Sequence, residues 1–196
     1  MNNLRELKVN FESLKPKFIM KKSKLLSIVG FAMTMLFATQ MNAQKFPGLD
    51  KSPMDAALYR TERNAPPLAK VVYSRPQLNG RSLSSLVPEG QVWRTGANEA
   101  TEITFYSDAT IGGKAIKAGT YTLFTVPGEK EWKVILNSDI NAWGSYSHDK
   151  SKDVVEVSAP VSMADDSIEA FAITFDKDGT MHLGWDKVRV AVPTFK

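Results

Sequence analysis

The chain has 196 residues, of which 43% are hydrophobic, and carries a formal net charge of +4. This length suits about one domain with a sizeable core. The sequence holds no cysteine, which excludes disulfides, thiol nucleophiles and thiolate metal sites.

The first apolar stretch of the chain indicates export. After Met20 come four residues of which three are lysine, then residues 25–38, which are almost entirely apolar, and then a small residue before Gln44. This order is typical of a cleaved secretory signal peptide. We therefore predict that translation starts at Met20, so that residues 1–19 are an upstream extension outside the natural protein. We further predict a signal peptide over 20–43, cleavage near Ala43, and a mature protein that is periplasmic or secreted.

A membrane anchor is the alternative for this stretch, but about 14 apolar residues fall short of the ~20 that span a bilayer. We expect no transmembrane segment in the mature chain. The first 43 residues hold seven of the 25 basic residues and two of the 21 acidic ones, which leaves 18 against 19. A nearly neutral domain gives no support for nucleic-acid binding, which depends on neutralising phosphates.

Residues 44–68 are predicted to form an irregular arm, because proline and glycine are scattered through them. Ser52 followed by Pro53 suits the first turn of a helix. We therefore expect a short helix over residues 54–59 within this arm.

From Ala69 onward the hydrophobic pattern has a period of two, which is the signal of β-strands. Gly112 and Gly113 predict a tight hairpin turn. About nine short strands and no long amphipathic helix predict an all-β, antiparallel β-sandwich over residues 69–196, with a closed barrel as the alternative. The expected strands near the end of the chain cover 154–158, 168–175, 181–185 and 188–192.

Several segments of the chain resemble one known family. They are Ser74–Pro76, Gly80–Arg81, Leu86–Gly90, Val92–Thr101, Ala118–Glu129 and Trp143–Gly144. Together they are similar to the exported bacterial family catalogued as domain of unknown function 2911, over about residues 49–193. The resemblance implies a β-rich exported protein of Gram-negative bacteria and carries no activity. Residues 83–85 depart from the family pattern, which we expect to alter local packing only.

Arg94, Asn98 and Glu99 form the densest group of chemically useful side chains. An arginine can hold a carboxylate or phosphate, and an amide and a carboxylate can bind hydroxyl groups. The structural alternative is a network in which Arg94 pairs with Glu99 and Asn98 satisfies the loop backbone. Arg75 is a further candidate, either for an anionic ligand or for a structural pair with Glu99 or Glu102.

The loop around Trp143, Tyr146 and His148 is the second candidate. Indole and phenol rings beside amide, hydroxyl and imidazole groups could form a platform for a saccharide. The alternative is a loop that buries Trp143 to fix itself to the sandwich. His148 and His182 lie in different elements without ligand spacing, so we expect no metal site and no cofactor.

Three functions are consistent with these features. The first is a non-catalytic envelope protein that binds a small polar or saccharide ligand, or a partner protein. The second is a small periplasmic hydrolase with Glu99 as acid or base and Arg94 as the stabiliser of negative charge. The third is a structural envelope protein without a ligand. We favour the first, since no recognisable nucleophile or metal cluster accompanies Glu99, and we assign no catalytic residue.

Overall fold

The structure is a computed structural model that describes residues 21–24, 27, 29, 31 and 44–195. The predicted signal peptide lies largely outside the described residues. Residues from Gly48 onward form one compact unit, and the fold described below is that of this unit.

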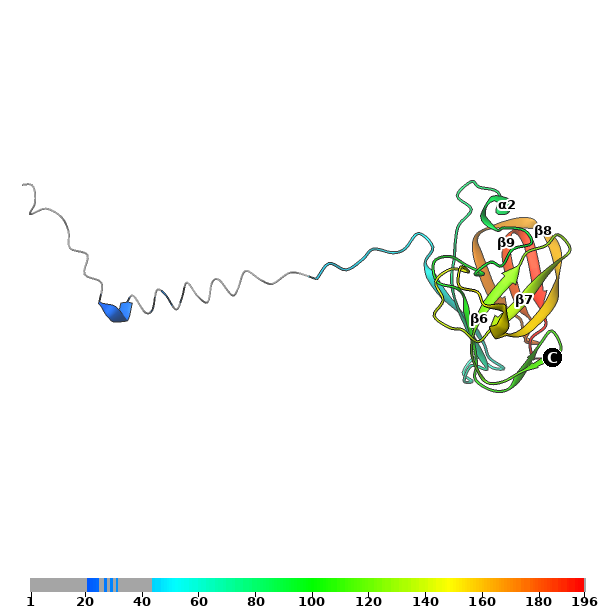
Figure 1. The fold of residues 1–196 in the computed structure, drawn as a ribbon, viewed down its shortest axis with the longest axis horizontal. Coiled ribbons are helices and arrows are strands. Elements are labelled where there is room, and N and C mark those ends of the chain that lie inside the picture. The colour runs from blue at the N-terminus through cyan, green and yellow to red at the C-terminus, as the bar shows by residue number, and fades with distance from the viewer. Residues whose placement is uncertain (1–20, 25–26, 28, 30, 32–43, 196) are drawn as a thin grey trace, which may run out of the picture. The chain divides into compact units, whose positions relative to one another are not determined.

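Seven strands form the main sheet, in the order β1-β2-β3-β6-β7-β8-β9, and every neighbouring pair is antiparallel (Figure 1). A two-stranded ribbon of β4 and β5 is separate from it. The strands are β1 (Met54–Tyr59), β2 (Ala69–Ser74), β3 (Glu102–Phe105), β4 (Ala109–Ile111), β5 (Lys114–Ile116), β6 (Gly119–Val126), β7 (Glu131–Asn137), β8 (Asp153–Phe175) and β9 (Met181–Val192). The two short helical turns are α2 (Leu83–Leu86) and η2 (Lys150–Lys152). The all-β, antiparallel prediction is confirmed.

The strand β1 occupies the place where a helix was expected, so that prediction is wrong. Residues Met54–Tyr59 pair along their whole length with β2, from Met54 opposite Ser74 to Tyr59 opposite Ala69. Pro53 directly precedes the strand. Because it lies outside the paired residues, its missing N–H removes no hydrogen bond between β1 and β2. The available pairing partner, rather than local propensity, decides the conformation here.

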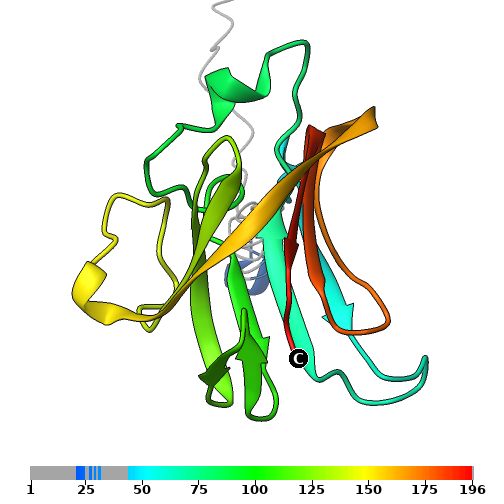
Figure 2. The same ribbon diagram turned by 90° about the vertical axis from the view of Figure 1, so that its right-hand side faces the viewer.

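The strand β8 passes from one layer of the sandwich to the other. Its first part, Asp153–Pro160, pairs with β7, and its second part, Val161–Phe175, pairs with β9. Two register shifts interrupt the second pairing, and irregularities of this kind bend a strand. Figure 2 shows β8 running diagonally across the end of the fold. The two strands expected over 154–158 and 168–175 are therefore parts of one strand, and β9 likewise unites the two expected after it.

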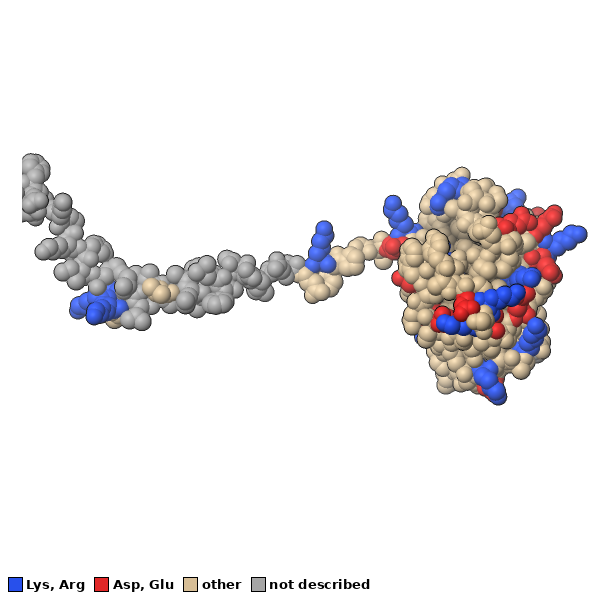
Figure 3. Space-filling view, in the orientation of Figure 1, with Lys and Arg blue, Asp and Glu red and all other residues tan. Residues whose placement is uncertain are grey.

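The hydrophobic core lies between the two layers and is rich in aromatic rings, whereas charged side chains of both signs lie on the surface of the domain (Figure 3). Trp93 is 4% exposed and its ring contacts Trp132, Trp185 and Phe171, with centroids 5.3 to 6.0 Å apart. A second, smaller cluster of Ala100, Phe124 and Ile135 lies apart from this core. The alternation of β6 explains both clusters, because Leu123 packs into the main core and Phe124 into the smaller one.

The chain after β2 closes the sandwich against β8. Gln77 bridges to Ala170, the Phe171 amide donates to the Pro76 carbonyl over 2.9 Å, and the Leu78 amide donates to the Glu169 carbonyl over 3.0 Å. The second part of β8 is therefore bonded on both edges, to β9 and to this segment. The predicted hairpin at Gly112 and Gly113 is confirmed, with positive φ at both glycines between β4 and β5.

Candidate functional site

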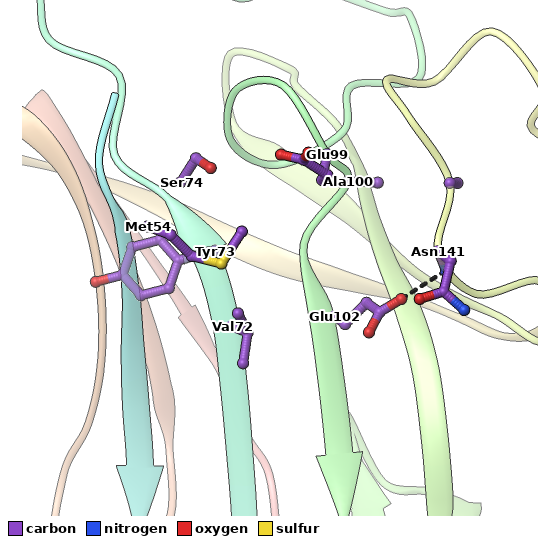
Figure 4. A pocket seen from close by; sticks show the side chains of 9 residues that line it. Met54, Val72, Tyr73, Ser74, Glu99, Ala100, Glu102 and Asn141 are labelled. Atoms are coloured by element: carbon purple, nitrogen blue, oxygen red, sulfur yellow. Dashed lines mark hydrogen bonds between the residues drawn. The ribbon is translucent and has the colours of Figure 1, made fainter. Parts of the chain in front are cut away.

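A hollow of about 280 Å³ opens where β2 and β3 separate. The two strands pair only from Ala69 to Val72, with Val72 opposite Glu102, and beyond this point their backbones part. Figure 4 shows Glu99 and Glu102 on one side of the gap and Met54 and Ser74 on the other. The end of a strand pairing thus creates a concave surface bordered by carboxylates.

A second hollow, of about 310 Å³, continues the first. Both are lined by Met54, Ser74 and Glu99, and the second adds Asp50, Ser52, Asn98 and Trp143. We call the two together the β2–β3 cleft. It brings together three of the residues singled out from the sequence, Asn98, Glu99 and Trp143.

Backbone hydrogen bonds between two loops form one wall of the cleft. The Ala100 amide donates to the Ala142 carbonyl over 2.9 Å, and the Gly144 amide donates to the Asn98 carbonyl over 3.0 Å. Glu99 and Trp143 face each other in this short antiparallel bridge. The Asn141 amide also donates to the Glu102 carboxylate over 2.6 Å. These bonds fix the position of Glu99 and Trp143 although both lie in loops.

An exposed aromatic pair stands at the edge of the cleft. The rings of Trp143 and Tyr146 are stacked, with centroids 5.9 Å apart and an interplanar angle of 21°. Trp143 is 63% exposed and Tyr146 is 82% exposed. The loop therefore does not anchor itself by burying Trp143, and the rings remain accessible to a ligand.

His148 stabilises the loop and is not part of the exposed aromatic pair. Its Nε2 lies 2.8 Å from an Asp153 carboxylate oxygen, and its ring meets Phe124 edge to face. The same Asp153 oxygen accepts from the Asn137 amide group over 2.8 Å, and Asn137 also donates to the Asp149 carbonyl. This half-buried network joins both ends of the 138–152 loop to β7 and β8. His148 therefore supports the loop from below and does not line the cleft.

Arg94 does not take part in the cleft. It is not among the residues that line either hollow, and among the described residues it forms no ion pair with Glu99. Its Nε atom is buried without a hydrogen-bond partner there. Trp93 forms an antiparallel bridge with Thr125. In this register the next residue, Arg94, lies opposite Phe124. Arg94 is therefore on the face that points away from the main core. The structural alternative in which Arg94 pairs with Glu99 is therefore not seen among the described residues.

Arg75 is held by partners other than the two expected. Its guanidinium donates to Asp55 over 3.0 Å and to the Phe171 carbonyl over 3.0 Å. Asp55 lies opposite Tyr73 in the β1–β2 register, which brings its carboxylate within reach. Arg75 therefore joins β1, β2 and β8, and neither Glu99 nor Glu102 is its partner.

All the charged side chains that line the cleft are acidic. Its charged lining residues are Asp50, Glu99 and Glu102, and neither lysine nor arginine lines it. Asp50 accepts hydrogen bonds from the Ser52 amide and the Asn98 side chain. In the part of the chain that the structure describes, no group of three or more histidine or acidic side chains is arranged to hold a metal ion. The cleft is thus suited to neutral or cationic groups.

Asp50, Glu102 and Asn141 were not predicted from the sequence as site residues, and Glu102 was considered only as a partner for Arg75. Each comes from a different segment, and only the strand pairing and the loop bridge bring them together. The alternation of β3 carries a partial signal, because Glu102 stands two residues from Thr104 on the face opposite to Ile103 and Phe105.

The fold and the cleft define a small all-β sandwich domain with an open, acidic surface site beside a pair of exposed aromatic rings. The model of a family described as "Protein of unknown function (DUF2911)" matches residues 52–194. The chain belongs to this family, which confirms the resemblance drawn from its sequence. Comparison with curated proteins and with solved structures gives no match. None of the helices among the described residues is long and apolar enough to cross a membrane.

Proposed function

We propose that this chain is an exported, non-catalytic binding protein and that the β2–β3 cleft binds a saccharide. The observation that carries the proposal is the exposed stack of Trp143 on Tyr146 beside a hollow lined by Asp50, Asn98 and Glu99. Aromatic rings offer a rigid apolar surface, and such surfaces with a few polar groups are the usual composition of a ligand site.

The polar groups define which hydroxyl-bearing ligands fit. Glu99 is exposed, and carboxylates accept hydrogen bonds from hydroxyl or ammonium groups. Because no lysine or arginine lines the cleft, a uronic acid would bring a like charge close to Glu99 and Asp50. We therefore expect a neutral or amino-substituted sugar to bind in preference to an acidic one.

Thermal unfolding in the presence of sugars tests this function. The panel contains neutral disaccharides, amino-sugar oligomers and glucuronic-acid oligomers, because a ligand that binds only the native state raises the melting temperature. A rise is expected with a neutral or amino sugar, and it should disappear in Trp143→Ala. Tyr106→Ala is the matched control, since Tyr106 is also an exposed aromatic residue but does not line the cleft.

Two outcomes speak against the saccharide site. No rise with any sugar would remove the ligand class, and a rise that survives Trp143→Ala would move binding away from the aromatic pair. A rise with glucuronic-acid oligomers alone would contradict the charge argument.

A further inference from the structure

A separate groove of about 480 Å³ lies on another part of the domain. Three elements form it: the segment around α2, the turn between β6 and β7, and the pair of β8 and β9. It shares no lining residue with the β2–β3 cleft. Figures 1 and 2 show α2 beside the end of the sandwich where β6 turns into β7.

The walls of this groove are held by backbone hydrogen bonds. The Gly90 amide donates to the Pro127 carbonyl over 2.9 Å, which joins the two turns that flank the groove. The Val161 amide donates to the Lys130 carbonyl over 2.9 Å, which joins the β6–β7 turn to β8. The groove is therefore formed in the free protein, and a ligand would not need to open it.

The floor is apolar and the rim is acidic. Apolar side chains that line it are Leu83, Val87, Trp132, Met163 and Val188. The carboxylates that line it are Glu89, Glu129 and Asp186, and no lysine or arginine does so. Glu89 and Glu129 are exposed and form no ion pair within the described part of the chain. A complementary ligand carries positive charge beside apolar groups.

The exposure of the groove to solvent favours a large ligand over a small one. Met163 on its wall is 68% exposed, and Ser82, Ser84, Glu89 and Glu129 around it are exposed as well. Sites for small molecules enclose most of the ligand surface, whereas a strip of a larger partner keeps one side in solvent. We propose that this groove binds an extended segment of a partner protein in which lysine or arginine stands next to an apolar side chain.

Selection from a phage-displayed random peptide library on the purified protein tests the proposal. The recovered peptides should combine basic with aliphatic or aromatic residues. Glu129→Lys should weaken binding of a recovered peptide by about tenfold or more, since a like charge at an interface rim costs over 1.4 kcal/mol, the equivalent of a factor of ten. Met163→Ser, which removes part of the apolar wall, should weaken it too.

Glu62→Lys is the control, because Glu62 is also exposed and lies outside the groove, and the substitution changes the net charge by the same amount. Binding by the control should stay within about twofold, because the reversed charge does not line the groove and the interaction of exposed charges is weakened by salt. Failure to recover peptides, peptides without basic residues, or equal weakening by both variants would each overturn the proposal. Two further outcomes would also contradict the proposal. If the protein self-associates and Glu129→Lys abolishes this, the groove binds a second copy of the chain. If benzylamine alone displaces the peptide, the groove binds small amines. Neither result bears on the saccharide cleft, because Trp143 is not altered.

Discussion

The hydroxyl of Tyr73 bonds to both backbone groups of Ile173. It accepts from the Ile173 amide over 3.0 Å and donates to the Ile173 carbonyl over 3.2 Å. Tyr73 lies on β2 and Ile173 on β8, 100 residues apart. A side chain thus replaces the neighbouring strand at this point of β8, next to the backbone bonds made by Pro76 and Leu78.

Tyr73→Phe should lower the free energy of unfolding by about 1–3 kcal/mol, because it leaves a buried amide and a buried carbonyl without their partner. Urea unfolding measures the change. Tyr121→Phe is the control, since its hydroxyl donates to the Lys117 carbonyl at an exposed position, and it should cost much less. Equal stabilities of the two variants would show that water replaces the Tyr73 hydroxyl.

The same pair predicts a pH dependence. Burial raises the pKa of Tyr73 above its ordinary value of 10.0, so the unfolded chain loses this proton at a lower pH than the folded protein does. The stability that Tyr73 contributes is therefore complete below about pH 10 and declines as the pH rises above it. Unfolding curves between pH 8 and pH 11 should show this decline in the native protein and a shallower one in Tyr73→Phe.

Truncation of Trp93 and of Trp143 should lower the free energy of unfolding by very different amounts. Trp93→Ala should cost about 3–5 kcal/mol, because it removes a buried ring from the centre of the aromatic core. Trp143→Ala should change stability by about 0.5 kcal/mol or less, as expected for an exposed side chain. A large loss of stability in Trp143→Ala would make this ring part of the core and would remove it from the proposed saccharide site.

Asp153→Ala should weaken both stability and binding at a distance from the cleft. It removes one of the two acceptors of the Asn137 amide group and the carboxylate partner of His148, and a largely buried polar group left without a partner costs about 1–3 kcal/mol. The 138–152 loop that carries Trp143 would then be less fixed. Chemical unfolding and sugar titration of this variant, beside the exposed control Asp165→Ala, separate this effect from a mere change of charge.

Arg94 and Glu99 should act independently. They form no ion pair in the described part of the chain, so the effects of Arg94→Ala and Glu99→Ala on unfolding should add to within about 0.5 kcal/mol in the double variant. A larger coupling energy would restore the network expected from their spacing in the sequence.

Processing of the chain is testable in cells. If residues 20–43 are a signal peptide, protein recovered from the envelope or the medium should begin near Gln44, which Edman degradation or mass spectrometry of the intact protein measures. Lys22→Glu combined with Lys24→Glu should slow this processing, because it reverses charge in the basic region before the apolar stretch. Recovery of a full-length, membrane-bound form would contradict cleavage.

The alternation of apolar residues was enough to predict strand conformation from β2 onward, since alternation is a local property of the chain, but it divided β8 and β9 into two strands each. It could not predict β1, because Ser52 and Pro53 are compatible with the start of a helix and equally with the entry to an edge strand. The sequence pattern did not predict the full length of β8 either. Pro160 and the acidic pair after Met163 interrupt its pattern, and only the change of partner from β7 to β9 makes it one strand.

The site was predictable in part for the same reason. Asn98, Glu99 and Trp143 were chosen for their chemistry, and the loop bridge brings them to one cleft. The partner of Arg75 was not predictable, because Asp55 reaches it only through the register of β1 on β2. Arg94 was placed with Glu99 on sequence proximity, whereas the Trp93 bridge to Thr125 directs it elsewhere.

The passage of β8 through both layers has a consequence for folding. One layer cannot detach from the other without breaking this strand's bonds either to β7 or to β9. The sandwich should therefore unfold as one cooperative unit, and its transitions by different spectroscopic probes should coincide. The slowest amide protons of β7 and of β9 should exchange with the same free energy, that of global opening, because no partly open form retains one layer intact.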